Sequence, residues 1–534
     1  MKTTIKNLIL SAALVVGGAS CVDLDTAPYD RETDLTYWEE DPEAAVKALN
    51  TCYTYLGNMD EQLYCEAMTD NAYTKQPNDA TQNIGNGSYS TADPYVKKVW
   101  DGRYTGIRMC NELLENIDRV PDLDPELKKR YIGEAKVLRA YNYYELYTKF
   151  GDVPYTTKVL SIKESMSIAR TAKATVIANV LADLDEVING NYLPTSYDAD
   201  NKGRITRWAA MAIKAKIYLF EGNWTQVKNI TSTIMTEGGF KLFGSYAGLF
   251  EIANEYNSEV ILDAQYRPTS REHQMMYAFL PPSLGGYSQL SPLQELVDSY
   301  IMLDGKTIKE TGTSFDESHP YANRDPRLKA TVMYTGNSYT LIDGTEVVIN
   351  CEKGEGKDGY GVGSDCSATG YYIKKYWDNT YRATLYSGLN PILIRYADIL
   401  LMNAEALAEL GELDKTAWDA TIKPIRDRAG FTLASALEFP EGASKDKLIE
   451  IVRNERRSEL ALEGHRHKDI IRWRIADDVL NGWCHGLKTN EVVGTDNGYV
   501  RVENRAFNAN RHYLWPIPQA ERDLNGNLVQ NPNW

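Results

Sequence analysis

Regularly spaced carboxylates are the first candidates for chemistry in this 534-residue sequence. Glu455, Glu459 and Glu463 recur at every fourth position, so a helix would place all three on one face. Paired carboxylates are the groups with which glycoside hydrolases cleave sugars, but they must flank a cleft in contrasting environments. A single charged helix does not provide that arrangement. Arginines interleave the same segment, so internal ion pairing is the simpler interpretation, and a surface glycoside hydrolase stays an alternative.

Two further patterns have residue types or spacings that are typical of a metal site or a dinucleotide-binding loop, but each lacks a required feature. His465 and His467 could ligate a metal ion, but no third ligand stands beside them, so we assign the pair to the structure. The run from Gly354 to Gly359 has the spacing of a dinucleotide-binding loop. Such a loop must lead into a helix, which the glycine-rich residues that follow cannot begin well. We therefore predict a surface loop there. No residue is assigned to a catalytic, metal or cofactor site, so we predict a protein without enzyme activity or cofactor, and whether it holds a metal ion stays open.

The overall charge and the cysteines narrow the class of protein further. A formal net charge of −16 repels phosphate backbones, so nucleic acid is a poor partner. Six cysteines follow Cys21 without forming any CxxC pair, and we expect buried thiols. Cys351 and Cys366 bracket a glycine-rich loop, so one disulfide between them stays an alternative.

Helical periodicity dominates the chain up to about residue 240. Gly222 and Gly411 each close a helix, and aligning them also aligns Ala215 with Ala404, a weak repeat of tetratricopeptide type. Helical hairpins of this kind bury their apolar faces by stacking on one another. In this first half we predict helices at about 94–119, 125–150, 173–189, 206–221 and 224–236.

Two later stretches lose the helical period. Residues 240–390 are rich in Gly, Tyr, Thr and Asn, and strand-like runs at 331–334 and 345–350 flank a turn at Asp343-Gly344. Residues 465–534 are similarly irregular. The predicted fold is therefore mostly α, with tetratricopeptide-like stacked helical hairpins and an irregular, loop-rich second lobe that contains short strands. We place an N-terminal helical domain at 21–240 and a C-terminal domain at 241–534, the latter with a helical hairpin at 392–465.

The first residues indicate export and lipidation. Residues 1–20 combine a basic start, an apolar run and small residues before Cys21, which is typical of a signal peptide. Gly18-Ala19-Ser20-Cys21 resembles a bacterial lipobox, with Gly18 where Leu is usual. We expect cleavage before Cys21 and acylation of its thiol, which would tether the protein to a membrane.

Four phrases occur in a fixed order near the C-terminus, and together they carry a family resemblance. They are Pro391–Ala406, Asn454–Arg466, Trp515–Pro518 and Gln530–Trp534. The chain resembles the SusD/RagB family of outer-membrane nutrient-binding lipoproteins. Asn533-Trp534 departs from the Gly-Tyr that is more usual at the end of this family.

The resemblance implies a ligand site in loops that lie between the scaffold helices. Tyr and Trp, of which the chain has 36 and 10, offer a flat apolar face that can stack on a sugar ring, while Asp, Asn and Arg bind its hydroxyls. A packing role is at least equally common for any one Tyr. The candidate ligand-binding residues are Asp70, Asn71, Tyr73, Tyr89, Tyr287, Tyr376, Trp377 and Arg382.

The resemblance also implies a function and a partner. Proteins of this family capture oligosaccharide or polysaccharide at the cell surface and deliver it to a SusC-like TonB-dependent transporter of the outer membrane. The lipid anchor would hold this chain at that surface. Three alternatives stay open at this point: a RagB-like peptide-capturing protein, the glycoside hydrolase already named, and a purely structural helical-repeat adaptor.

Overall fold

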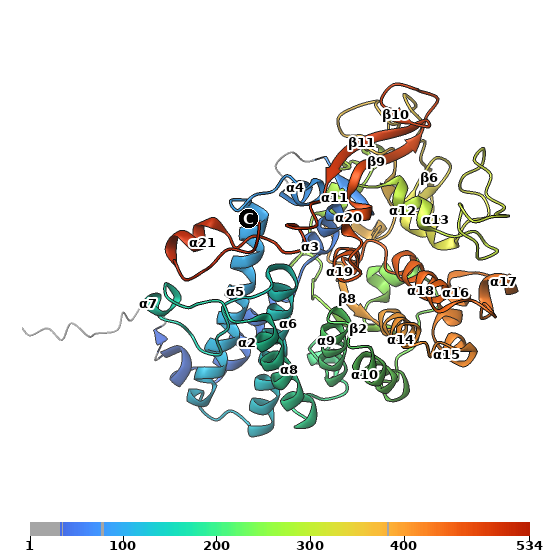
Figure 1. The fold of residues 1–534 in the computed structure, drawn as a ribbon. Coiled ribbons are helices and arrows are strands. Elements are labelled where there is room, and N and C mark those ends of the chain that lie inside the picture. Colours follow the sequence, from blue (N-terminus) through green and yellow to red (C-terminus); the bar gives the residue numbers. More distant parts are fainter. Residues whose placement is uncertain (1–32, 35, 76–79, 382–383) are drawn as a thin grey trace, which may run out of the picture.

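The first half of the chain is a layer of helices packed side by side, as the computed structural model shows (Figure 1). The structure describes residues 33–34, 36–75, 80–381 and 384–534. The helices of this half are α2 (Ala44–Tyr53), α3 (Met59–Tyr64), α4 (Ala80–Asn86), α5 (Pro94–Asn116), α6 (Pro125–Phe150), α7 (Ile162–Ser165), α8 (Lys173–Asn189), α9 (Arg207–Phe220) and α10 (Trp224–Glu237).

Local signals set the ends of the two longest helices. The side chain of Asp93 accepts hydrogen bonds from the first backbone N–H groups of α5, and Asp124 does the same for α6. Pro94 and Pro125 follow these caps at the first helical position, where no backbone N–H is needed. Gly151, with a φ of 72°, ends α6. The predicted ranges 125–150 and 173–189 are confirmed to the residue.

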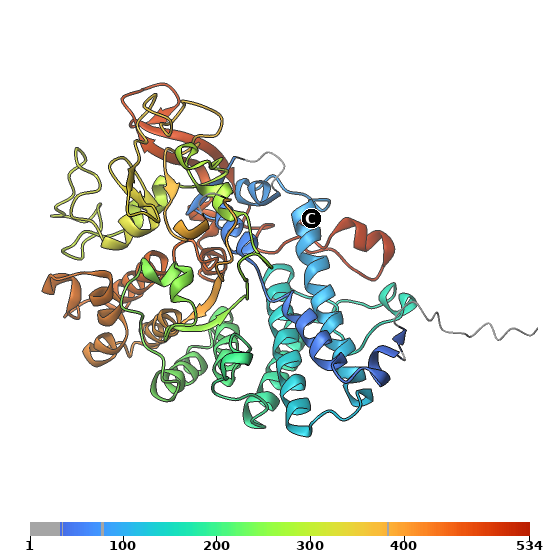
Figure 2. The ribbon, with the colours of Figure 1, turned by 180° about the vertical axis from the view of Figure 1, so that it is seen from behind.

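Successive helices stack into one curved array that takes in both halves of the sequence (Figures 1 and 2). α6 packs between α5 and α8, α9 between α8 and α10, and α10 then packs against α14 (Tyr396–Leu410), which contacts α18 (Lys445–Glu459). Gly222 and Gly411 both adopt left-handed backbone angles at the ends of α9 and α14, as the repeat predicts. The tetratricopeptide-like stacking is thereby confirmed.

The second lobe consists of short helices and small antiparallel sheets around its own apolar core. The other helices of the second half of the chain are α11 (Met275–Phe279), α12 (Gln294–Ser299), α13 (Pro326–Thr331), α15 (Lys415–Ala420), α16 (Ile422–Ala429), α17 (Ala434–Leu437), α19 (Arg466–Arg472), α20 (Ala476–Val479) and α21 (Gln519–Leu524). Of these, α21 lies outside the second lobe, beside α5 (Figure 1). The strands are β1 (Ala72–Thr74), β2 (Val260–Asp263), β3 (Leu290–Pro292), β4 (Val332–Met333), β5 (Ser338–Thr340), β6 (Glu346–Val348), β7 (Tyr372–Ile373), β8 (Ile392–Arg395), β9 (Asn481–Lys488), β10 (Thr495–Asp496) and β11 (Tyr499–Ala506).

The strands correct the sequence prediction in two places. The turn at Asp343-Gly344 does join two strands, but its partners are β5 and β6, whereas the predicted strand at 331–334 pairs as β4 with β7. The stretch 465–534 is less irregular than predicted. Its strands β9 and β11 pair over their eight-residue length, with bulges, and β10 adds a third strand.

The cysteines of the described ranges form no disulfide. Cys351 and Cys366 are free and buried, so the alternative of a disulfide between them is wrong. The other cysteines of the described ranges are free as well, and all but the half-buried Cys65 are buried. Cys21 lies outside the described residues. Across the ranges that the structure describes, no helix has the length and apolar content needed to cross a bilayer.

Candidate functional site

The central carboxylate of the regular series, Glu459, lies at the centre of a buried ion-pair network. It accepts hydrogen bonds from Arg395 (2.6 Å) and Arg327 (2.9 Å) and also pairs with Arg428. Burial by itself raises the pKa of Glu459, but the three guanidinium groups outweigh burial and hold that pKa well below its usual range. The side chain is fully buried, so it serves the framework and does not face a substrate.

Its two neighbours in the series are buried and paired in the same way. Glu455 pairs with Arg426 at 2.7 Å, and Glu463 pairs with Lys375 at 2.7 Å. Ion pairing is therefore confirmed, with one correction. These cations belong to α16 and to the segment after β7, whereas the sequence placed the partners on the same helix.

Asp70 and Asn71 are also committed to the framework. Asp70 accepts hydrogen bonds from Arg466 at 2.8 and 2.9 Å and pairs with Arg457 at 2.9 Å. Asn71 donates to Glu66 and accepts from Arg457, each at 2.9 Å. Both side chains are buried, and they fasten the segment before β1 to α18 and α19. Asn71 is fully buried and Asp70 is only 5% exposed, so both side chains serve the framework.

Three more of the candidate residues are buried or half-buried and contact other parts of the chain. Tyr89 is buried with its ring centroid 4.8 Å from that of Trp534. Tyr376 is buried and donates from its hydroxyl to the carbonyl of Leu462 (3.0 Å). Trp377 is half-buried and donates its indole N–H to the carbonyl of Thr340 (2.9 Å). The remaining candidate of this group, Arg382, lies outside the described residues.

Tyr287 is the candidate that the structure places at the surface with a second aromatic ring. It is 37% exposed, Tyr277 on α11 is 38% exposed, and their ring centroids lie 4.2 Å apart. The backbone N–H of Tyr287 donates to the carbonyl of Tyr277 (2.9 Å), which holds the two backbone segments that carry these rings together. Gly285 makes this close return possible, because it takes a left-handed φ of 83°. We call Tyr277 and Tyr287 the tyrosine pair.

Tyr73 lies on β1, which pairs with β3, the strand that follows the tyrosine pair in the sequence. In β1 it pairs with Ser291 of β3, and the next residue but one, Lys75, donates its backbone N–H to the carbonyl of Gln289 (2.9 Å). The Lys75 ammonium group donates to the carbonyls of Ser364 (2.6 Å) and Cys366 (2.9 Å). The ladder thus brings the Tyr73 and Lys75 segment next to the segment that carries the tyrosine pair.

A polar cluster beside Tyr73 was not predicted from the sequence. Gln82 on α4 donates to the Tyr73 hydroxyl (3.3 Å) and to Glu503 (3.0 Å), and Asn86 also donates to Glu503 (3.1 Å). Glu503 belongs to β11, more than 400 residues later in the sequence. No local sequence pattern could have predicted this cluster, because it depends on the tertiary contact between α4 and β11.

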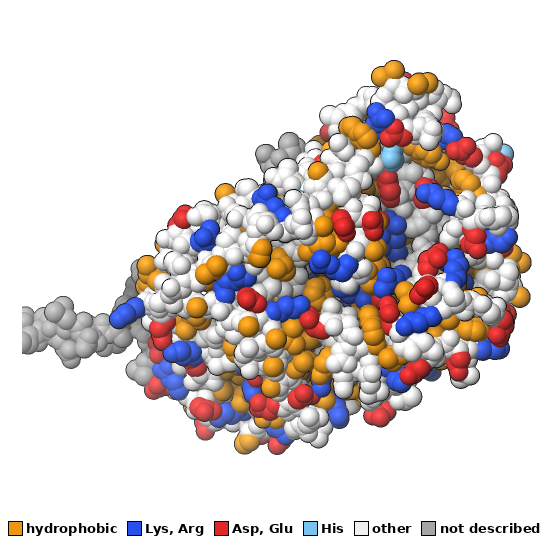
Figure 3. Space-filling view, viewed as in Figure 1, with side chains coloured by type: hydrophobic (Ala, Val, Ile, Leu, Met, Phe, Trp, Pro, Cys, Tyr) orange, Lys and Arg blue, Asp and Glu red, His pale blue; other side chains and the backbone are white. Residues whose placement is uncertain are grey.

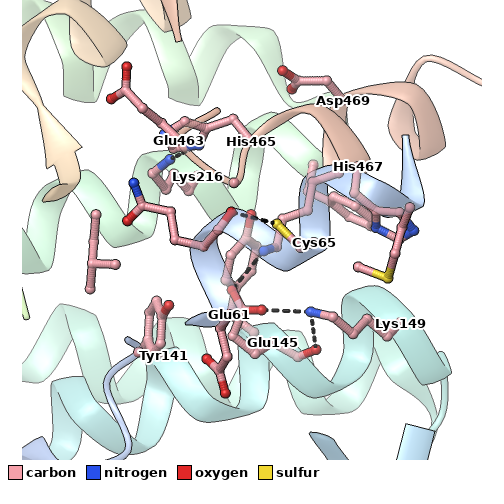
Figure 4. A pocket seen from close by; sticks show the side chains of 18 of the residues that line it. Glu61, Cys65, Tyr141, Glu145, Lys149, Lys216, Glu463, His465, His467 and Asp469 are labelled. Atoms are coloured by element: carbon pink, nitrogen blue, oxygen red, sulfur yellow. Dashed lines mark hydrogen bonds and ion pairs between the residues drawn. The ribbon is translucent and has the colours of Figure 1, made fainter. Parts of the chain in front are cut away.

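The interior also holds a charged cavity of about 120 Å³ among α3, α6, α9 and α19 (Figure 4). Lys149 donates to Glu145 at 2.6 Å, Lys468 pairs with the same carboxylate at 2.8 Å, and Lys216 pairs with Asp398 at 2.6 Å. Every charged residue that lines the cavity has an ion-pair partner. The space can hold several waters, but it offers no unpaired charge to a ligand.

His465 and His467 line this same cavity. Burial lowers the pKa of both to about 3, so both imidazoles are neutral near pH 7. Over the described ranges, no three His, Cys, Asp or Glu side chains gather closely enough to hold a metal ion. The pair packs within the scaffold, in agreement with the structural role assigned from the sequence.

Comparison with known families decides what kind of scaffold this is. A model of the SusD family matches residues 249–534, which is more than half of the chain. The chain belongs to the SusD family. A second model, described as starch-binding and associating with the outer membrane, matches residues 37–219.

Individual SusD-like proteins are similar to this chain over nearly its whole length. SusD-like protein P25 of Formosa agariphila is 27% identical, over 99% of this chain and 98% of the relative. A crystal structure of a SusD-like carbohydrate binding protein from Bacteroides fragilis superposes with a TM-score of 0.81 at 29% identity, covering 92% of this chain and 100% of that one. A second SusD-like protein of B. fragilis gives 0.80 at 27% identity, with 95% and 100% covered. The predicted family and fold class are confirmed.

Proposed function

We propose that this SusD-family chain binds oligosaccharide at the cell surface and does not cleave it. The observation that carries the proposal is the tyrosine pair, two rings held together with more than a third of each side chain exposed. An aromatic face can stack on the apolar face of a sugar ring, and nearby polar side chains can bind its hydroxyls. The likeness to the SusD-like carbohydrate binding protein of B. fragilis supports this choice of ligand.

The same proposal includes a place in the cell and a partner. We propose that the signal peptide at 1–20 is removed and that Cys21 is lipidated, so that the protein is anchored at the outer membrane and faces outward. The outer-membrane association in the description of the family model supports that location. There the protein would pass its oligosaccharide to a SusC-like TonB-dependent transporter.

Replacing Tyr287 by Ala should weaken oligosaccharide binding by about 5- to 150-fold, because a central aromatic anchor contributes roughly 1–3 kcal/mol to binding. Tyr287→Phe should retain most of the affinity, since it keeps the ring and removes only the hydroxyl. The measurement is titration calorimetry on the mature chain with Cys21→Ser, using oligosaccharides identified on a glycan array.

The matched control is Tyr218→Ala, which removes a half-buried ring from the scaffold helix α9. It should leave binding unchanged. Equal affinity of Tyr287→Ala and the unsubstituted protein would refute the choice of site. Binding of peptides in place of glycans on a parallel peptide array would favour the peptide-capturing alternative. Shortened oligosaccharides in the product mixture after incubation would favour the hydrolase.

A further inference from the structure

A second cleft opens beside the sheet formed by β9, β10 and β11, away from the tyrosine pair. Its volume is about 480 Å³, within the range of roughly 300–1,000 Å³ that is typical of small-molecule sites. β9, α12 and α18 supply its walls, and Figure 3 shows the surface hollowed just below the sheet. None of the residues from 275 to 289, which carry the tyrosine pair, lines this cleft. We call it the Trp483 cleft.

Trp483 gives the cleft an aromatic wall. Its side chain is 43% exposed, which is unusual for the largest apolar side chain, and it lines the cleft directly. Its backbone is held in the sheet by pairing with Asn504, and the guanidinium carbon of Arg501 lies 5.5 Å from the ring centroid. The indole N–H has no hydrogen-bond acceptor among the residues that the structure describes. An exposed ring on a paired strand, with an unused donor, is suited to a ligand that has both an apolar face and hydroxyl groups.

The opposite wall carries polar groups that are held in place from behind. Arg457 donates to Asn71 and to the backbone carbonyl of Asp70, which fixes its guanidinium group. Asn454 donates to the carbonyl of Ser299 (3.0 Å), and its side-chain oxygen receives no hydrogen bond from any described residue. Such pre-positioned groups bind a ligand without first losing side-chain freedom.

The charges around the cleft nearly cancel. Four carboxylates line it, from Asp70, Glu295, Asp298 and Asp478, together with three cations, from Lys309, Arg457 and Arg505. A strongly anionic or cationic ligand would meet like charges on part of the wall. A neutral ligand with many hydroxyl groups meets donors and acceptors without that repulsion.

We propose that the Trp483 cleft is a second saccharide-binding site, in which Trp483 stacks on a neutral sugar ring and Asn454 and Arg457 bind its hydroxyls. This inference rests on the proposed function, since it assigns the same class of ligand to a separate surface. The chain would then contact oligosaccharide at two places, the tyrosine pair and the Trp483 cleft, which share no lining residue.

The test isolates the cleft by first removing the tyrosine pair. The probes are maltohexaose, laminarihexaose and xylohexaose, all neutral, and binding is measured by titration calorimetry on the mature chain with Cys21→Ser. A variant with Tyr277→Ala and Tyr287→Ala should keep residual binding to the probe that the unsubstituted protein binds. Adding Trp483→Ala should weaken this residual binding by roughly tenfold or more. Val492→Ala, which alters an 87% exposed residue between β9 and β10 outside the cleft, is the matched control and should change nothing.

The possible outcomes separate the two proposals. Residual binding that Trp483→Ala leaves unchanged, or no residual binding at all, overturns the second site while the tyrosine pair stands. Binding that is lost with Trp483→Ala alone and unaffected by loss of both tyrosines supports the Trp483 cleft and refutes the tyrosine pair. No binding of any probe by the unsubstituted protein overturns both. Each variant must also give the circular dichroism spectrum of the unsubstituted protein. We expect Trp483→Ala to fold normally, because the side chain that it removes is exposed.

Discussion

Glu459→Gln should lower the free energy of unfolding by about 3–5 kcal/mol, because it removes one charge from a buried, paired set. Arg395, Arg327 and Arg428 all pair with this carboxylate, and Glu459 is fully buried. Glutamine has the same shape, so the cost comes from cations left without compensation in a medium of low dielectric. Urea denaturation followed by circular dichroism measures the change.

Glu438→Gln is the matched control for this experiment. Glu438 pairs with Lys415 at 3.1 Å, but both side chains are more than half exposed. The same substitution there should change stability by less than about 1 kcal/mol, since water screens the pair. Equal losses for the two variants would contradict the view that burial of the network, and not ion pairing as such, makes Glu459 important.

The difference between the unsubstituted protein and Glu459→Gln should also depend on pH. The folded state depresses the pKa of Glu459, so its stabilising effect is fully present above the unfolded-state value of about 4.3. As the pH falls below that value, the unfolded chain takes up a proton that the folded chain does not, and the difference shrinks. Denaturation at pH 7 and at acidic pH therefore gives a second check, and an unchanged difference would contradict the assigned pairing.

The sequence was a good guide wherever local chemistry decides the structure. Asp124-Pro125 and Gly151 set both ends of α6, so its range could be predicted to the residue. Gly411 ends α14 for the same reason, and the resulting repeat indicated the stacked hairpins. Strands were harder, because β5 is only three residues long and β9 contains two glycines, which hides any alternation of apolar and polar residues.

The candidate site depends on contacts that no local pattern contains. Tyr89 and Tyr287 are the same residue type in similar loops. One is buried against Trp534 at the far end of the chain, and the other is exposed beside Tyr277. Asp70 has the composition of a ligand contact, but arginines almost 400 residues later neutralise it. The family resemblance predicted a region for the ligand site, and tertiary packing determines which side chains in that region face outward.

The buried network and the exposed rings are parts of one arrangement. Arg395 at the end of β8 pairs with Glu259 just before β2, and with Glu459 and Glu463 at and beyond the end of α18. These pairs join the helical scaffold to the second lobe, whose loops hold the tyrosine pair and one wall of the Trp483 cleft. A rigid junction of this kind reduces the conformational freedom that a ligand must otherwise remove on binding.

Trp515→Ala should destabilise the protein by about 3–5 kcal/mol, the range for removing a large aromatic side chain from a packed core. Trp515 is 2% exposed, and its ring packs edge-on against Phe150 of α6 with centroids 5.8 Å apart. Its backbone N–H donates to the carbonyl of Lys149 (2.7 Å), a bond that Ala retains. The loss therefore measures the ring alone, which fills the space between the C-terminal segment and the ends of α5 and α6.

Trp483→Ala provides the matched control, since it makes the same substitution at a ring that is 43% exposed. Its effect on the free energy of unfolding should stay below about 1 kcal/mol, because surface substitutions leave no cavity. Thermal and urea denaturation of the two variants side by side measure the contrast. If Trp515→Ala were as mild as Trp483→Ala, the C-terminal segment would contribute little to the scaffold, and its close packing on α6 would have no energetic consequence.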